Sequence, residues 1–447
     1  MQGEQFEKEK KEARDIINKL SSITQGEQFE QGKYDLQAGF PFGQNWNRNS
    51  PYAGTENPKV KWEYKLYNKD VPYASGAPAF SAQPAIGRDG TLYVTTANKK
   101  LYAFNPDGSV KWVKEDIASG TTPVIAEDGT IYVVLGKITA VNPDGSIKWQ
   151  TKSSVSTIGP VLDRDGTIYV RVGNQLEAYN PDGSKKWSSN EILPVSGGGL
   201  LSKDGTIYTL EVYLENKYLY AHDKNGKMLW KKAIDGKPSG FALGLNGEIF
   251  LNTRDKLYVY DKNGNIVHQW KAKDKEVFLG APTISSTDGT IYVGGEGYIY
   301  AYNPDYSLKW KYPIPTKRDV KDVPVIDKNG VIYFKTYDEM YALNPDATLK
   351  WKMPKSTSDF SGSITIGKDG TLYTNGYLPL PNNGTYYSFI AIGDSYTDNV
   401  CTKESTFMEV LKSLEAKSKN AKLTEEEKKE AREILKRLSD DLDKKDN

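Results

Sequence analysis

The sequence predicts an all-β fold, an eight-bladed β-propeller closed by an N-terminal outer strand, with helical segments at both ends. Three observations predict this fold. A motif of two turns and four short apolar runs recurs eight times, with a period near forty residues. Tyr (30) and Trp (9) are abundant, and aromatic residues favour strands. One such motif forms a sheet too small to bury both of its faces, so we expect the sheets to pack radially against one another.

The first turn of each repeat is an Asp-Gly, Asn-Gly or similar pair between two apolar runs, as in Asp128-Gly129 before Thr-Ile-Tyr-Val. Such pairs mark hairpins because glycine adopts a positive φ at low energetic cost. An inner strand is expected before each turn, and a strand with Tyr or Phe after it. The turn glycines are Gly90, Gly129, Gly166, Gly205, Gly247, Gly289, Gly330 and Gly370.

A second turn, such as Asn142-Pro-Asp-Gly145, separates the third strand of each repeat from an outer strand. Tyr306 and Ala347 replace its glycine in the sixth and seventh repeats. Because a side chain disfavours positive φ, we expect these two turns to differ in backbone conformation from the others.

The tryptophans indicate the number of blades. Seven of the tryptophans end an outer strand. In the eighth repeat, the strand 389–392 has no Trp after it. The segment Asn57–Trp62 has the pattern of an outer strand with no blade before it. We therefore predict that it completes the eighth blade and closes the ring. The predicted blade-docking residues are Trp62, Trp112, Trp149, Trp187, Trp230, Trp270, Trp310 and Trp351.

Both ends of the chain differ from the repeats. Apolar residues follow a helical stripe in 4–22 and again near the C-terminus, where Thr424 and Glu427 form a capping box. We expect an N-terminal amphipathic helix and linker over 1–35, the propeller over 44–398, and two helices within 403–447. The helices could form a small bundle on the propeller, repeat as linkers in a tandem array, or bind another copy or partner.

Composition excludes several classes of function. The formal net charge is +1, so no overall field recruits nucleic acid or an acidic membrane. No apolar run approaches the roughly 18 residues of a membrane span, and the polar N-terminus predicts no signal peptide. The single cysteine, Cys401, excludes an intrachain disulfide and a cysteine-rich zinc site.

The motif Ala-x-Asn-Pro-Asp-Gly-x-x-Lys-Trp resembles the tryptophan-docking repeat of the pyrroloquinoline-quinone-like propellers. The resemblance covers roughly 44–398. The lead-in Gln44-Asn-Trp46 and Arg48-Asn-Ser50 is also similar to that family. The turn here is one residue shorter than the family pattern, and Val259 stands where the family has Ala. The family includes quinoprotein alcohol dehydrogenases and non-catalytic relatives, among them an outer-membrane assembly lipoprotein. The resemblance implies that each Trp stacks on the next blade, and it favours an extracellular or envelope location without fixing the compartment.

The candidate catalytic and metal motifs are weak. Catalytic members of the family use a quinone, calcium and usually a disulfide between adjacent cysteines, which one cysteine cannot form. Gly393-Asp-Ser395 resembles an esterase nucleophile block, but His222 and His268, the two histidines, both precede it within repeat strands. Asp163-Arg-Asp165 resembles half of a calcium loop and lacks the later Glu. We expect no cofactor, no metal and no enzyme activity.

The connections from one outer strand to the next inner strand diverge most, and those after repeats five to seven place cations beside aromatic residues. They are the predicted binding loops for an acidic protein strip or a glycan. The expected function is a non-enzymatic scaffold that presents variable loops to a protein partner. The alternatives are a carbohydrate-binding cell-surface propeller and a residual quinone-dependent enzyme. The candidate residues are Lys271, Lys273, Phe278, Tyr312, Lys317, Arg318, Lys321, Lys355 and Phe360.

Overall fold

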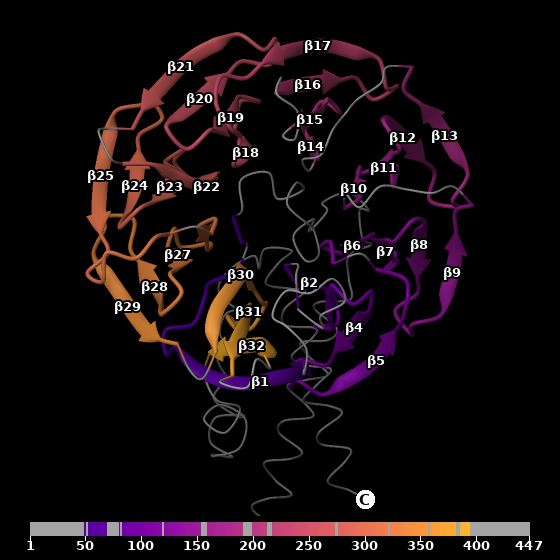
Figure 1. Cartoon of the computed structure of the whole chain (residues 1–447), viewed down its shortest axis with the longest axis horizontal. Helices are drawn as coiled ribbons and strands as arrows, with labels where there is room; N and C mark the ends of the chain where they lie inside the picture. The colour runs from indigo at the N-terminus through magenta and orange to yellow at the C-terminus, as the bar shows by residue number, and fades with distance from the viewer. Residues whose placement is uncertain are drawn as a thin grey trace, which may run out of the picture. The chain divides into compact units, whose positions relative to one another are not determined.

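The computed structural model describes residues 49–393 apart from 51, 69–79, 81–82, 119, 153–158, 191–198, 212–216, 273–275, 321, 356–357 and 381–384. These residues form eight four-stranded antiparallel sheets arranged in a ring (Figure 1). The predicted all-β fold and the number of blades are confirmed. The described residues form no helix, so none of them belongs to a helix able to span a membrane. The terminal helices predicted within 1–35 and 403–447 lie outside the described residues.

Blades 1 to 7 each contain four strands that are consecutive in sequence, ordered from the axis outward. Blade 1 comprises β2 (Ala85–Ile86), β3 (Leu92–Thr95), β4 (Leu101–Phe104) and β5 (Val110–Lys114); blade 2 comprises β6 (Val124–Ile125), β7 (Ile131–Val134), β8 (Ile138–Val141) and β9 (Ile147–Gln150); blade 3 comprises β10 (Val161–Leu162), β11 (Ile168–Val172), β12 (Gln175–Tyr179) and β13 (Lys185–Ser188); blade 4 comprises β14 (Gly199–Leu201), β15 (Ile207–Glu211), β16 (Tyr218–His222) and β17 (Met228–Ala233). Blade 5 comprises β18 (Gly240–Leu243), β19 (Ile249–Asn252), β20 (Lys256–Tyr260) and β21 (Ile266–Lys271); blade 6 comprises β22 (Phe278–Ile284), β23 (Ile291–Gly295), β24 (Tyr298–Tyr302) and β25 (Leu308–Pro313); blade 7 comprises β26 (Val325–Ile326), β27 (Ile332–Lys335), β28 (Glu339–Leu343) and β29 (Leu349–Pro354).

Blade 8 joins the two ends of the described chain. Its order from the axis outward is β30 (Asp359–Ile366), β31 (Leu372–Pro379), β32 (Thr385–Gly393) and β1 (Lys59–Asn68). In the antiparallel pairing of β1 with β32, Trp62 lies opposite Ala391. The same Ala–Trp pair recurs as Ala103–Trp112 in blade 1 and Ala301–Trp310 in blade 6. The N-terminal strand therefore has the register of every other outer strand that carries the repeat motif.

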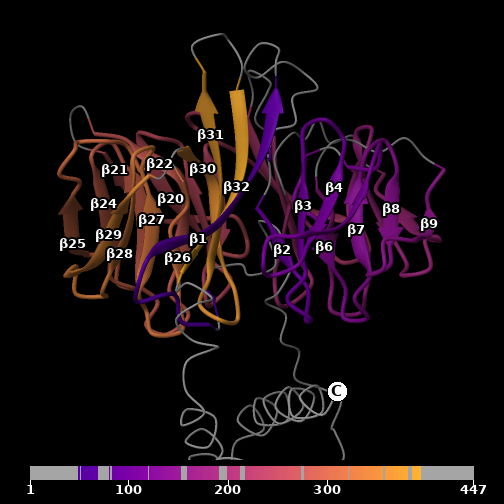
Figure 2. The same cartoon turned by 90° about the horizontal axis from the view of Figure 1, so that it is seen from below.

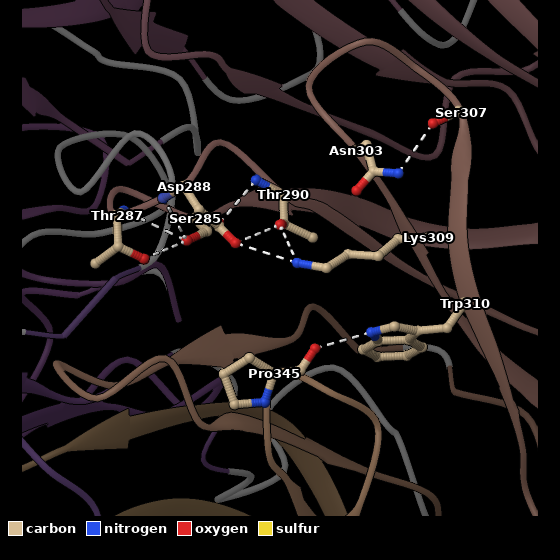
Figure 3. Close-up of polar contacts among 9 residues, drawn as sticks. All are labelled: Ser285, Thr287, Asp288, Thr290, Asn303, Ser307, Lys309, Trp310 and Pro345. Carbon is tan, nitrogen blue, oxygen red and sulfur yellow. Dashed lines mark hydrogen bonds and ion pairs between the residues drawn. The ribbon is translucent and has the colours of Figure 1, made fainter.

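Each outer tryptophan except Trp351 reaches the second turn of the following blade. The Trp310 Nε1–H donates to Pro345 O at 2.9 Å (Figure 3), and Trp112 donates to Pro143 O at 3.0 Å. The indole lies flat against the turn backbone, so a Cβ built on Gly145 would lie 2.9 Å from the Trp112 ring. Glycine is favoured there because the indole occupies the space of a side chain.

The lead-in segment replaces the second turn that blade 8 lacks. The Trp351 Nε1–H donates to Thr55 O at 2.9 Å, where the other tryptophans use a turn carbonyl. Asn49 and Gly54 hold the segment under blades 6 and 7. The Asn49 side-chain amide donates to Ile284 O at 2.7 Å, and the Gly54 N–H donates to the Asp327 carboxylate at 3.0 Å. The seam between blades 7 and 8 thus resembles the others chemically, although its acceptor comes from before β1.

Blade 5 departs from the expected docking position. His268, not Trp270, lies opposite Val259 at the position that Trp occupies elsewhere. The His268 ring stacks on Tyr306 with centroids 4.6 Å apart, and Trp270, two residues further on, donates to Tyr306 O at 3.0 Å. Two additional residues between the turn and Trp270 cause the shift, which keeps both rings on the same side of the strand.

The expectation that the turns of Tyr306 and Ala347 differ from the others is wrong. Their N–H groups close the same turn, to Asn303 O at 2.8 Å and Asn344 O at 3.0 Å, as Gly108 does to Asn105 O. Both residues adopt the positive φ of the glycines, 72° and 68°. Packing of the neighbouring blade therefore outweighs the local preference against that conformation.

Replacing Ala347 by glycine is expected to stabilise the protein by about 0.5–1 kcal/mol, because glycine adopts a φ of 68° without a Cβ penalty. Urea denaturation of both proteins measures this difference. Ala126→Gly is the matched control, since Ala126 has no positive φ. A loss of stability in Ala347→Gly as large as in the control would contradict the strain at this position.

Candidate binding face

The two faces of the ring are built from different kinds of connection. The first and second turns of the blades lie on one face, which we call the turn face. The first turn has five residues in seven blades, as in 87–91, and six in blade 6; each second turn in blades 1 to 7 has five, as in 105–109. Lys–Asp–Thr contacts brace many of these turns: Lys309 Nζ lies 3.2 Å from the Asp288 carboxylate and 3.0 Å from Thr290 Oγ1 (Figure 3). The turn face is therefore nearly uniform around the ring.

The opposite face carries the irregular connections and is called the loop face. The turn between the second and third strands ranges from two residues (296–297 in blade 6) to six (212–217 in blade 4). The connection between blades ranges from four residues (355–358) to sixteen (69–84). Figure 2 shows the strands of blade 8 rising above the other blades on this side. Variation on a rigid frame is typical of a recognition surface.

The predicted loop residues that the structure describes lie at or near the loop face, but their side chains have different environments. Lys271 and Tyr312 lie near the ends of β21 and β25, and Lys317, Arg318 and Lys355 follow β25 and β29. Lys273 and Lys321 lie outside the described residues.

The two predicted phenylalanines are not surface anchors. Phe278 in β22 and Phe360 in β30 are 3% and 1% exposed, and both pack in blade cores. Their rings lie in strands rather than in loops, because β22 and β30 begin earlier than the inner strands of blades 1 to 3.

Two of the predicted cations already have carboxylate partners. Arg318 Nε lies 3.0 Å from Asp338, and Lys355 contacts both Asp338 (3.7 Å) and Asp359. Asp338 belongs to the second-to-third strand turn of blade 7, so this network links three connections of the loop face. Such exposed pairs order side chains but add little stability.

Sequence reasoning missed a set of tyrosines that lie under lysines near this face. Lys311 Nζ lies 3.6 Å from the centroid of Tyr298 and 2.6 Å from the Glu276 carboxylate. Lys231 lies 3.7 Å from the centroid of Tyr218 in blade 4. The signal was a Tyr-x-Tyr pattern at the start of the third strand, which places both rings on one side of that strand. Tyrosine beside a cation is common at protein interfaces.

An ion pair between a buried lysine and a partly exposed carboxylate anchors the connection between blades 6 and 7. Lys335 at the end of β27 is 1% exposed, and its Nζ lies 2.5 Å from the Asp322 carboxylate. Burial lowers the pKa of Lys335 below its ordinary value, and Asp322 opposes that change. The charge of the lysine is therefore tolerated only with its partner in place.

The variant Asp322→Asn is expected to lose about 2–4 kcal/mol of unfolding free energy, because it leaves a buried ammonium without a counter-charge. The loss shrinks as the pH rises toward the ordinary lysine pKa, since the folded protein then holds Lys335 neutral. Chemical denaturation at several pH values measures this effect. The double variant Asp322→Asn/Lys335→Met removes both groups and is expected to stay near wild type; an equally unstable double variant would contradict the pairing.

The described residues contain no group of three His, Cys, Asp or Glu side chains arranged to hold a metal ion. His222 is buried in β16 beside Tyr220, and His268 belongs to the blade 5 seam. Asp165 of the calcium-like motif accepts the Thr167 N–H at 2.9 Å within the first turn of blade 3. Ser395 lies outside the described residues.

Comparison with known proteins gives the family. The family model described as outer membrane protein assembly factor BamB matches residues 114–211 and 173–375, more than half of the chain. The chain belongs to the pyrroloquinoline-quinone-like repeat family. The predicted resemblance is confirmed.

Solved structures similar to this pyrroloquinoline-quinone-like repeat protein share its fold. BamB from Moraxella catarrhalis is 14% identical, with a TM-score of 0.50 over 74% of this chain and 99% of that one. The Dos1 propeller is 10% identical, with a TM-score of 0.53 over 75% of this chain and 96% of its own. Among curated proteins, the uncharacterized protein YxaL of Bacillus subtilis (strain 168) is 36% identical over 91 residues. That match spans 20% of each chain.

Proposed function

We propose that this protein is a non-enzymatic binding scaffold that holds a protein partner on the loop face, between blades 6 and 8. The observation that carries the proposal is the contrast between the faces: uniform turns on one, irregular connections with half-buried tyrosines on the other. The lead-in segment also lies along the turn face, held by Asn49 and Gly54. The name of the matched family, an assembly factor, supports a role in contacts between proteins.

The contact surface would combine tyrosine anchors with a charged border. Tyr337 is 40% exposed at the tip of blade 7, beside the Arg318–Asp338–Lys355 network. Tyr298 under Lys311 adds a second anchor in blade 6. Because both charge signs occur there, the partner is expected to present mixed charges around an apolar centre rather than an acidic strip.

The glycan alternative has weaker support. Tyr67 and Tyr386 form a ring pair on blade 8, but their planes are inclined by 48°, so they do not form one flat stacking platform. A glycan array tests that alternative directly, and assays of ester hydrolysis and quinone-dependent dye reduction test the residual enzyme.

The proposal is tested by photo-crosslinking from one residue on each face. A photoreactive side chain at Tyr337 is expected to capture a partner, whereas one at Leu245, of similar exposure on the turn face, is not. Binding of the identified partner is then measured with Tyr337→Ala and Leu245→Ala. A loss of affinity in Tyr337→Ala but not in Leu245→Ala supports binding at the loop face. Capture of the partner from Leu245, or equal losses of affinity in both variants, contradicts it.

A further inference from the structure

One tryptophan is left over once the blades are accounted for. The sequence contains nine tryptophans, and eight of them donate from Nε1 at the seams between blades. The ninth, Trp46, lies three residues before the first described residue, Asn49. It belongs to a stretch, 36–47, that has no charged residue, although 26% of the whole chain is charged. Because this stretch also contains Phe40 and Phe42, its burial against an apolar surface is favourable.

The position of Asn49 limits where Trp46 can lie. The Asn49 side chain donates to Ile284 O at 2.7 Å and accepts from the Ser286 N–H at 2.8 Å, both in blade 6. Its backbone bridges to Ile326, the last residue of β26. Asn49 is therefore held at the turn-face ends of two inner strands. Three residues span at most roughly 10 Å, so the Trp46 backbone lies that close to Asn49.

The first turn of blade 5, 244–248, is a neighbouring turn with an exposed apolar side chain. Leu245 in this turn is 36% exposed. The equivalent residues of blades 1 to 4, 7 and 8 are all charged: Arg88, Glu127, Arg164, Lys203, Lys328 and Lys368. The Leu245 Cδ1 lies 3.9 Å from a Cβ built on Gly289, which belongs to the blade 6 turn that bonds Asn49. Leu245 and the start of the described chain therefore contact the same turn.

The blade 5 turn also lacks the cover that a proline gives in most blades. A Cβ built on Gly129 of blade 2 would lie 3.2 Å from Pro143 of the second turn. In blade 5, Lys262 replaces this proline, and a Cβ built on Gly247 meets no atom of the described residues within 4 Å. The Gly247 N–H donates to Gly244 O at 3.4 Å, whereas the same bond measures 2.9–3.0 Å in the other blades. The first turn of blade 5 is therefore the least covered and the most loosely closed of the eight.

We propose that Trp46 docks against Leu245 on the first turn of blade 5, so that the stretch 36–47 covers the turn face beside the axis. Leu245 supplies the aliphatic surface, and Gly247 leaves the backbone of the turn open to a ring. The stretch fits this place because covering it removes no charge from water. This contact lies on the turn face, away from Tyr337, and it does not rest on the proposed function.

The test uses the purified full chain with a photoreactive side chain at Leu245. Illumination is expected to join this position to the peptide that contains Trp46, within one copy of the chain, as measured by mass spectrometry of the digested monomer. Ile147, 49% exposed at the turn-face end of blade 2, is the matched control and is not expected to capture that peptide. Adding Trp46→Ala to the Leu245 variant is expected to lower the yield of this crosslink about tenfold.

Hydrogen exchange gives a second readout that leaves Leu245 in place. Peptides that cover 244–248 are expected to exchange faster in Trp46→Ala than in wild type, whereas those that cover the equivalent turn of blade 2, 126–130, are expected to stay unchanged. Circular dichroism checks that Trp46→Ala folds; if it does not, the crosslink map with Trp46 intact decides. Failure to capture the Trp46 peptide from Leu245, an equal yield in folded Trp46→Ala, or unchanged exchange at 244–248 overturns the proposal.

Discussion

Trp62→Ala is expected to lower the free energy of unfolding by about 3–5 kcal/mol, the range for large core residues truncated to alanine. Trp62 belongs to β1, and its ring contacts Phe389 of β32 (centroids 5.4 Å apart) and Phe104 of blade 1 (6.3 Å). Its Nε1–H donates to Pro106 O at 2.9 Å. One side chain thus connects β1 to its own sheet and to the next blade.

The position of Trp62 in the ring explains why the destabilisation in Trp62→Ala should extend beyond the cavity that the substitution leaves. Every other blade is a continuous stretch of chain, whereas blade 8 depends on β1, which precedes blade 1 in sequence. Weakening β1 leaves β32 as an exposed edge between blades 7 and 1. We propose that the β1–β32 pairing holds the ring closed, so hydrogen exchange in β30 to β32 should rise in the variant.

Tyr67→Ala in the same strand provides the control. Tyr67 is about half exposed, so its removal is expected to cost less than about 1 kcal/mol. Urea denaturation monitored by circular dichroism compares the two variants. Equal losses, or faster exchange confined to blade 1 in Trp62→Ala, would argue against a closing role for β1.

The repeat could be predicted because its parts are local. A turn such as Asn142-Pro-Asp-Gly145 requires its own residues at its own positions, and the Trp149 that follows is fixed by a short strand. The eight blades follow from counting these units. The register of blade 5 could not be predicted, because two added residues allow either His268 or Trp270 to face Val259, and only the packing of Tyr306 decides.

The candidate site was predicted less well, since its contacts join segments distant in sequence. The loop residues Lys317 and Arg318 were placed on the right face, but the pairing of Arg318 with Asp338 depends on blade 7 lying beside the connection. Phe278 and Phe360 were assigned to loops because the early start of β22 and β30 has no local signal. Thr55 as the acceptor for Trp351 likewise follows only from ring geometry.

The protein is expected to unfold cooperatively between about pH 10 and 12, because tyrosines in its blades are buried as neutral phenols. Burial raises the pKa of Tyr93, Tyr132 and Tyr208 to about 12, helped by the charge of a carboxylate in the first turn of the same blade. Tyr260 and Tyr302 are also raised to about 12, mainly by burial. These rings occupy the seams between blades, where water does not reach them.

The direction of this pH effect follows from comparing proton release in the unfolded and folded states. Above a pH of about 10 the unfolded chain releases its phenolic protons, whereas the folded protein keeps them until the raised pKa is reached. The stability that these tyrosines contribute is therefore complete below pH 10 and is lost as the pH rises toward 12. Each such group removes up to about 3 kcal/mol over that interval, so five together remove up to about 14 kcal/mol, which is near the upper end of the roughly 5–15 kcal/mol of a typical domain.

A pH titration that follows phenolate absorbance and circular dichroism together measures this transition, and the two signals are expected to change at the same pH. Tyr132→Phe removes one titrating group while keeping the ring, as Phe250 does at the equivalent position of blade 5. It should therefore unfold at a higher pH than wild type and match wild type at neutral pH. Phenolate absorbance that rises near pH 10 in a protein with intact circular dichroism would show that the seams admit water, and the burial of these rings would then not be what holds neighbouring blades together.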